Sequence, residues 1–266
     1  MSDEKSKATL LKEEIMMKGS KGAATLNAEE IKKADDFCVG YKEFLDHSPV
    51  EREAVSYTLE LAKKAGFTEY NENASYNAGD KVYYVNRDKA IALAVIGKNG
   101  VKNGARLAIA HIDSPRIDLK PNPLYEDTNL ALFKTHYYGG LKKYQWTALP
   151  LSLHGTVVKL DGTKVNITWG DDENESCFCV TDLLPHLAKD QVSKPLAKVF
   201  TGEDLNVLVG SRPYEDGNDE KDLVKLNVMS ILNKKYGIVE GDFLSAELCL
   251  IPSFKARDIG FDASMI

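Results

Sequence analysis

A chain of 266 residues has room for one large domain or two of ordinary size, and a hydrophobic content of 43% is ample for a packed core. The formal net charge of -6 argues against a nucleic-acid groove or an anionic membrane surface as partner, because both favour concentrated positive charge. Neither a membrane span, which needs about 18 continuous apolar residues, nor the apolar core of a signal peptide is present. We therefore expect a cytoplasmic protein that binds neither nucleic acid nor membrane.

Three helices are predicted near the N-terminus. Apolar residues recur at helical spacing over 6–18 and again over 27–45, where Asn27 and Glu30 make a capping pair. A third helix is predicted from an N-cap at Ser48 to a C-terminal glycine at Gly66. We interpret all three as scaffold.

Strand patterns follow over 81–85, 90–96 and 105–110, with Asn-Gly pairs between the last two that predict a turn. His111 stands at the end of the third predicted strand. Because ligands of open α/β sheets gather beyond the carboxyl ends of strands, this position favours a functional site over a random surface histidine.

The character of the sequence changes at about residue 119. Short β-like runs separated by Asp-Gly and similar turns give way to a helical pattern over 219–236, and residues 246–252 read as a strand that returns to the first domain. The sequence thus predicts an α/β protein with an inserted, mostly β domain. The β-like runs of the insertion are 151–160, 164–169, 176–181 and 205–209, and the predicted segments are 1–118, 119–245 and 246–266.

Within the stretch Arg106–Arg116, an imidazole and a carboxylate stand two positions apart. On a strand, His111 and Asp113 would leave the same face, so that Asp113 could orient the ring of a metal-ligating His111. On spacing alone a second interpretation stays open, in which these are ordinary polar residues at a strand end where Pro115 breaks the ladder.

The four cysteines are too sparse for a disulfide framework, so reduced thiols are expected. Cys177 and Cys179 would share one face of a strand, which allows a soft metal site, but an ordinary buried strand is the favoured interpretation. His154 lies in an alternating strand pattern and is interpreted as structural.

Four motifs resemble the aspartyl-aminopeptidase family of dinuclear metal-dependent aminopeptidases, most closely the N-terminal portion of its bacterial branch. They are Ala-His-Ile-Asp-Ser-Pro-Arg-Ile-Asp-Leu-Lys (110–120), Pro-Leu-Tyr-Glu-Asp (123–127), Lys-Thr-His-Tyr-Tyr-Gly-Gly with Lys-Lys-Tyr-Gln-Trp (134–146), and Ala-Arg-Asp-Ile-Gly-Phe-Asp-Ala-Ser-Met-Ile (256–266). The resemblance implies a mixed-sheet α/β metallopeptidase domain, incomplete at its C-terminus, with an inserted dimerisation domain.

The resemblance also implies roles for three residues. His111 matches a metal ligand, Asp113 matches the carboxylate behind it, and His186 matches a histidine that the inserted domain sends into a neighbouring subunit's active site, where it could stabilise an oxyanion. It further implies two Zn²⁺ ions per active site, with Co²⁺ as the alternative metal, a peptide substrate, and self-association into a dodecamer built from dimers.

The family's chemistry needs more ligands than these residues supply. In the family, a bridging aspartate, a Glu pair, another carboxylate and a final histidine follow the region that matches 256–266, and Asp262 does not match the bridging position. The chain is therefore expected to be a fragment of a metal-dependent aminopeptidase and inactive alone. The competing hypothesis is a non-catalytic assembly module with a vestigial metal residue.

Overall fold

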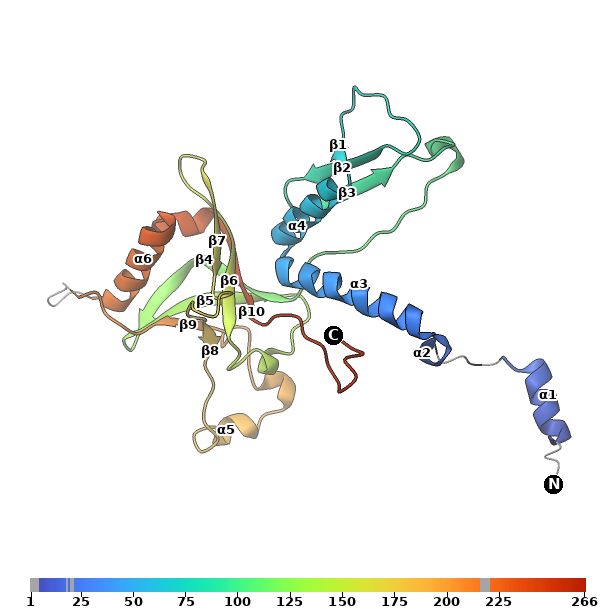
Figure 1. The fold of residues 1–266 in the computed structure, drawn as a ribbon. Helices are drawn as coiled ribbons and strands as arrows, with labels where there is room; N and C mark the ends of the chain where they lie inside the picture. Colours follow the sequence, from blue (N-terminus) through green and yellow to red (C-terminus); the bar gives the residue numbers. More distant parts are fainter. Residues whose placement is uncertain (1–4, 18, 20–21, 216–220) are drawn as a thin grey trace. The chain divides into compact units, whose positions relative to one another are not determined.

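The computed structural model describes residues 5–17, 19, 22–215 and 221–266 (Figure 1). The chain divides into two compact units, residues 1–43 and residues 44–266, which are considered separately below. Among the described residues, none of the helices has the length and apolar content needed to cross a bilayer.

The first unit is helical. It contains α1 (Lys7–Ile15), α2 (Gly22–Thr25) and most of α3 (Ala28–His47), which continues into the second unit. The predicted capping box opens α3: the side chain of Asn27 accepts a hydrogen bond from the backbone N–H of Glu30, and the Glu30 carboxylate accepts one from the N–H of Asn27. The helices expected over 6–18 and 27–45 form as Lys7–Ile15 and Ala28–His47, and residue 18 lies outside the described residues.

The third predicted helix, α4 (Glu51–Lys64), begins later than expected. Its N-cap is Val50, not Ser48, whose backbone N–H instead donates to Leu45 O at the end of α3. Ser48 therefore closes the preceding helix, and the predicted N-cap is wrong. At the other end the prediction is confirmed, because Gly66 follows the C-cap with a φ of 83° that favours glycine.

A small mixed sheet follows α4. Strand β1 (Thr68–Glu69) pairs in parallel with β2 (Lys81–Asn86), which pairs antiparallel with β3 (Ala90–Val95). Helix α4 packs against β2 and β3, so that its apolar side chains cover one face of this sheet. The strands predicted over 81–85 and 90–96 are confirmed.

The strand predicted over 105–110 does not form. After a short 3-10 turn, η1 (Val101–Asn103), the chain runs on without ladder partners, and the side chains of Leu107 and Ile109 are 80% and 88% exposed. A strand needs a hydrogen-bonding neighbour and cover for its apolar face, and the described residues supply neither to this segment.

A seven-stranded sheet forms the largest part of the second unit, in the order β7-β6-β10-β4-β5-β9-β8 (Figure 1). All its pairings are antiparallel. Its strands are β4 (Arg116–Asp127), β5 (Leu130–Tyr138), β6 (Leu151–Val158), β7 (Lys164–Trp169), β8 (Cys179–Val180), β9 (Val207–Gly210) and β10 (Ala246–Pro252). With the small mixed sheet and the helices, this makes the mixed α/β architecture that was predicted.

Strand β10 lies inside this sheet. The strand predicted over 246–252 forms, but it pairs with β4 and β6 and not with the small mixed sheet. The sheet therefore runs from residue 116 to residue 252.

Strands β4 and β5 form a long hairpin that the hydrophobic pattern did not indicate. Pro121 and Pro123 interrupt β4, and the pairing register shifts between Leu119 and Leu124. Asn122, between the two prolines, has a φ of 46°. Prolines in a strand are typical of such bulges, because proline cannot donate to the ladder.

The main core lies between the large sheet and α6 (Leu223–Tyr236), together with the 3-10 segment η4 (Glu240–Ser245) (Figure 1). Phe133 of β5 meets Phe243 of η4 edge to face, with ring centroids 6.1 Å apart. Three shorter elements, η2 (Lys143–Gln145), α5 (Lys189–Val192) and η3 (Leu196–Lys198), lie in the connections. Helix α6 confirms the helical pattern predicted over 219–236 from residue 223 on, while residues 219 and 220 lie outside the described part of the chain.

Candidate metal centre

His111 and Asp113 lie in the extended segment between η1 and β4. Their prediction as two residues on one strand face is wrong, because this segment is not a strand. The two side chains still meet: Nδ1 of His111 is 2.8 Å from the backbone O of Asp113 and 3.0 Å from its Oδ1. The pair is thus formed locally, by residues two positions apart in a segment without regular secondary structure.

This geometry fixes the tautomer of the ring. Both atoms that face Nδ1 are oxygens that only accept, so Nδ1 must carry the proton and donate it. The lone pair of the neutral ring is then on Nε2, and the His111 side chain is 83% exposed. An imidazole held by a carboxylate at Nδ1 with a free Nε2 is the usual arrangement of a metal-ligating histidine.

Asp113 has a second partner across the β4–β5 hairpin. The hydroxyl of Tyr138 donates a hydrogen bond of 2.9 Å to Asp113 Oδ2. This bond is the main cause that lowers the pKa of Asp113 below its ordinary value, and it raises the pKa of Tyr138. Asp113 is therefore a carboxylate at neutral pH, able to accept from both His111 and Tyr138.

The guanidinium of Arg116 packs against the aromatic ring of Tyr138. These two residues are directly paired in the β4–β5 ladder, and the guanidinium carbon lies 4.1 Å from the centre of the Tyr138 ring. Arg116 is buried and donates to Asp118 Oδ1 at 2.7 Å and to Glu51 Oε1 at 2.6 Å. Both residues lie in the motifs that carry the family resemblance, but the sequence did not connect either to the His111–Asp113 pair, because the hairpin that joins them was not expected.

His186 lies apart from the pair. It is exposed in a turn after β8, and within the described residues no hydrogen bond joins it to His111 or Asp113. Its neighbours Leu183, Leu184 and Leu187 are exposed as well. A cluster of exposed leucines around a histidine is typical of a surface that is covered by another subunit.

His154 stands in a buried cluster that superficially resembles a nucleophile triad. Its Nδ1 donates to Glu53 Oε1 at 2.9 Å, while its Nε2 lies 3.0 Å from Ser152 Oγ and 3.1 Å from Asp171 Oδ1. Burial alone lowers the pKa of His154, but the hydrogen bonds to Asp171 and Glu53 outweigh it and raise the pKa to about 9.

At neutral pH this ring is therefore an imidazolium and cannot take a proton from Ser152. With 1% of its surface exposed, His154 is also out of reach of a substrate. The cluster is a structural ion network that joins α4 to β6 and to the turn after β7, in line with the structural role predicted for His154.

The cysteines carry no metal site in the part of the chain that the structure describes. All four are free thiols, and no group of three or more His, Cys, Asp or Glu side chains in that part is arranged to hold a metal ion. Burial raises the pKa of Cys179 and of Cys249, so both are protonated at neutral pH.

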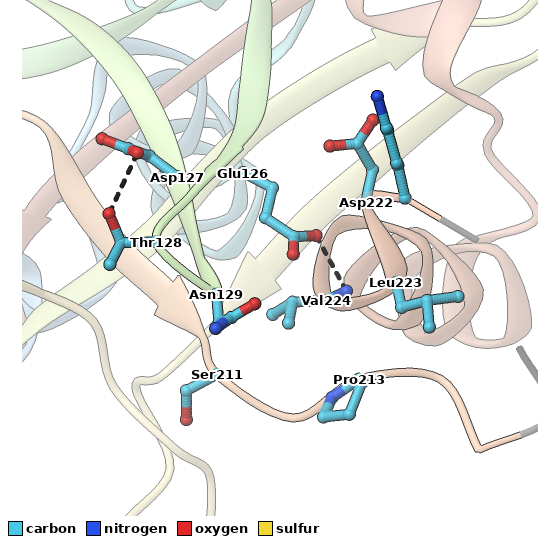
Figure 2. A pocket seen from close by; sticks show the side chains of 10 residues that line it. Glu126, Asp127, Thr128, Asn129, Ser211, Pro213, Asp222, Leu223 and Val224 are labelled. Atoms are coloured by element: carbon cyan, nitrogen blue, oxygen red, sulfur yellow. Dashed lines mark hydrogen bonds between the residues drawn. The ribbon is translucent and has the colours of Figure 1, made fainter. Parts of the chain in front are cut away.

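A hollow of about 520 Å³ lies at the N-terminus of α6, lined by residues of the β4–β5 turn and by 221–224 (Figure 2). Helix N-termini attract anions, but here Glu126 already fills that role. Its Oε2 accepts hydrogen bonds of 2.9 Å from the backbone N–H groups of Val224 and Lys225. The backbone N–H groups at this helix end are thus already paired with the carboxylate of Glu126. Neither His111 nor Asp113 lines the hollow.

The described residues supply only part of a zinc site. The oriented imidazole of His111 is a suitable zinc ligand, yet zinc sites in proteins use three or four protein ligands, and the described residues bring together no such group. A complete centre would need ligands from elsewhere.

The comparison with known proteins decides the family. Residues 44–266 match the family described as aminopeptidase I zinc metalloprotease, M18. The chain belongs to the M18 family of aminopeptidases. It is 51% identical over 230 residues to a probable M18 family aminopeptidase 1 of Clostridium acetobutylicum, an alignment that covers 85% of this chain and 49% of the relative.

Solved structures of the family share the fold. The M18 aminopeptidase of Thermotoga maritima superposes with a TM-score of 0.86 at 42% identity, over 93% of this chain and 53% of that one. Aminopeptidase I of Borrelia burgdorferi gives a TM-score of 0.81 at 39% identity, over 92% and 55%. The M18 chain thus spans about half the length of the relatives that it matches.

Proposed function

We propose that this M18 chain forms the N-terminal part of a metal-dependent aminopeptidase that removes N-terminal residues from peptides. In this proposal His111 is a zinc ligand through Nε2, and Asp113 orients the ring through Nδ1. The observation that carries it is the contact of Nδ1 with Asp113 Oδ1 at 3.0 Å, in a chain that belongs to a family of zinc metalloproteases.

The metal centre in this proposal holds two Zn²⁺ ions, with Co²⁺ as the alternative. Zinc supplies Lewis-acid chemistry that polarises a carbonyl and activates water. Within this chain only the His111–Asp113 pair is assigned to it. We propose that the other ligands and the general base belong to the part that corresponds to the half of the relatives which this chain does not cover.

We propose in addition that His186 acts in the active site of a neighbouring subunit. Its turn is exposed and is surrounded by exposed leucines, as expected of a surface that becomes buried on self-association. The segment of residues 119–245, with β10 completing its sheet, would serve as the inserted dimerisation domain between segments 1–118 and 246–266. A dodecamer is the proposed assembly, since a structure of S. cerevisiae mApe1 with the same fold is described as a dodecamer.

A cytoplasmic location accords with four cysteines that are all free thiols. The competing function, a non-catalytic assembly module with a vestigial metal residue, is not favoured, because the relatives are named aminopeptidases and the family is described as a zinc metalloprotease.

The test uses the full-length gene product and its His111→Ala variant. We expect the parent to bind zinc or cobalt near stoichiometrically and to hydrolyse N-terminal residues from peptides, and we expect His111→Ala to lower both metal content and turnover. His136→Ala is the matched control, because His136 is an exposed histidine that stacks on Tyr137. A parent without metal, or a His111→Ala variant with unchanged metal and activity, would support the assembly-module hypothesis instead.

A further inference from the structure

We infer that Tyr138 is a positioning residue for the imidazole of His111 and acts through Asp113. The inference rests on the proposed function of His111 as a zinc ligand, and it adds a residue that the sequence motifs do not single out. The claim is that the Tyr138 hydroxyl keeps the Asp113 carboxylate in the orientation that holds the proton on His111 Nδ1.

The carboxylate is held at two points. Asp113 Oδ1 accepts from His111 at 3.0 Å, and Oδ2 accepts from the Tyr138 hydroxyl at 2.9 Å. A carboxylate bound through one oxygen rotates about its terminal torsion, because this torsion is broad and weakly restrained. With both oxygens engaged, the plane of the group is fixed and faces the imidazole.

The side-chain contact matters because the backbone here is weakly restrained. Residues 105–115 belong to none of the described strands, so no ladder fixes the segment that carries His111 and Asp113. Tyr138, in contrast, is the last residue of β5 and is paired with Arg116 of β4. The hydrogen bond from Tyr138 to Asp113 therefore ties the irregular segment 105–115 to the large sheet.

Tyr138 is itself held in place. The guanidinium of Arg116 lies over its ring at 4.1 Å, and this guanidinium is locked by Glu51 from the first turn of α4 and by Asp118 from β4. Arg116 is buried, and it cannot move away without leaving the half-buried carboxylates of Glu51 and Asp118 unpaired, which is unfavourable. The chain of contacts that runs from Arg116 through Tyr138 and Asp113 to the imidazole is therefore fixed by α4 and by the large sheet.

The expected consequence concerns the tautomer of His111. In water a neutral imidazole on a peptide prefers the proton on Nε2, which would block that atom as a ligand. Asp113 reverses this preference by accepting from Nδ1. When the tyrosine hydroxyl is absent, the carboxylate is released at one end and its hold on the Nδ1 proton weakens.

The experiment compares Tyr138→Phe with the parent chain by ¹⁵N NMR of histidine-labelled, metal-free protein at a pH where His111 is neutral. We expect the fraction of His111 with its proton on Nδ1 to fall at least twofold in Tyr138→Phe. Tyr137→Phe is the matched control, because Tyr137 is the preceding residue of β5, points to the opposite face, and packs on the core. The signals of buried His154 report whether each variant is folded.

A second variant tests the route. In an Asp113→Ala background the Tyr138→Phe change should leave His111 unaffected, because the effect passes through the carboxylate. In the full-length protein, Tyr138→Phe should weaken zinc binding about threefold to tenfold, less than the roughly 10–100-fold loss seen when a direct partner of a ligating histidine is removed. The zinc affinity also decides the question if a variant fails to give NMR spectra.

An unchanged His111 tautomer in folded Tyr138→Phe would overturn the inference, as would an effect that persists without Asp113. These outcomes are distinct from failure of the proposed function. If His111→Ala abolishes zinc binding but Tyr138→Phe changes neither tautomer nor affinity, the zinc role stands and the positioning role falls. If His111→Ala leaves zinc content and activity unchanged, the proposed function falls whatever the tautomer shows.

Discussion

The imidazole of His154 in β6 and the carboxylate of Glu53 in α4 meet at 2.9 Å although 101 positions separate them in the chain. On its other side the same ring lies 3.1 Å from Asp171. A buried cation between two carboxylates joins the helix before the small sheet to the large sheet, so its protonation should control how firmly the two are held together.

The first prediction is a loss of stability in alkali. The folded pKa of His154 is about 9 and its ordinary value is 6.5, so the folded state binds this proton more tightly than the unfolded state. The contribution is therefore complete below pH 6.5 and disappears as the pH rises to about 9. The contribution of His154 to the free energy of unfolding should be at most about 3–4 kcal/mol, since the two pKa values differ by about 2.5 and one pKa unit corresponds to about 1.4 kcal/mol.

Urea unfolding at several pH values between 6 and 10 checks this prediction. The free energy of unfolding of the unmodified 1–266 chain should fall over this pH range. The His154→Gln variant should be less stable at pH 6, and its free energy of unfolding should change little with pH. If the two proteins show parallel pH profiles, the ion network does not carry the pH dependence.

The second prediction concerns Gly155, which follows His154 in β6. A Cβ at this position would lie 1.9 Å from the backbone O of Glu247 in β10, and the φ of 138° also disfavours other residues. Gly155→Ala should destabilise the chain by about 3 kcal/mol or more, because two central strands must separate. Thermal unfolding is the measurement. Gly241→Ala is the control, since nothing lies within 4 Å of its Cβ, and a similar loss in both variants would contradict the steric explanation.

The third prediction concerns the ion pairs of the buried Arg116. Replacing this residue by leucine leaves the half-buried carboxylates of Glu51 and Asp118 without their partner, so the free energy of unfolding should fall by about 1–3 kcal/mol. Neutralising both acids in the same variant, as Glu51→Gln with Asp118→Asn, should recover part of the loss. Chemical denaturation of the parent chain, of Arg116→Leu and of the triple variant provides the test, and no recovery in the triple variant would contradict the explanation by unpaired carboxylates.

The fourth prediction concerns the exposed apolar segment before the metal-site pair. Leu107→Glu combined with Ile109→Glu should reduce self-association of the 1–266 chain severalfold by light scattering, because it removes two neighbouring exposed apolar side chains. The melting temperature should change little. Leu160→Glu is the control: its leucine is fully exposed but stands alone at a hairpin tip, so the same change there should matter less.

The fifth prediction concerns His186 in the full-length protein. His186→Ala should lower turnover about tenfold or more, in the range for loss of one oxyanion donor or acid, while zinc content and oligomer size stay unchanged. Enzyme kinetics, metal analysis and sedimentation provide the readouts. Normal turnover in this variant would remove the proposed role across the subunit boundary.

The helices were predictable because their signals are local. The capping box of Asn27 and Glu30 lies within four residues, and the glycine that ends α4 needs its positive φ whatever the rest of the fold does. The start of α4 was misplaced because Ser48 has the chemistry of an N-cap, and only the end of α3 decides that it is used otherwise.

The site was predictable only as far as the local pair of His111 and Asp113. Tyr138 reaches Asp113 through the register of the β4–β5 hairpin, and counting back from its turn would pair Arg116 with Leu141. The register shift between Leu119 and Leu124 moves the partner of Arg116 to Tyr138 instead. A bulge of this kind has no signature in the hydrophobic periodicity of the sequence. The two prolines within it are nevertheless a signal that strand prediction could use.

The pairing of β10 was not predictable for a similar reason. Its apolar pattern indicates a buried strand but not which neighbours bury it, because backbone hydrogen bonds carry no sequence code. The same pattern over 105–110 predicts a strand equally well, yet there the described residues provide no partner.

The place of β10 between β6 and β4 has a consequence for synthesis on the ribosome. The β6–β7 hairpin and the β4–β5 hairpin with β9 and β8 are each complete before residue 246 is made, and Leu151 of β6 can already bridge to Phe178 beside β8. The facing edges of β6 and β4, however, stay unpaired until β10 pairs with both. Nascent chains shorter than about 252 residues therefore expose two unpaired strand edges at once, which makes them clients for chaperones that shield such edges.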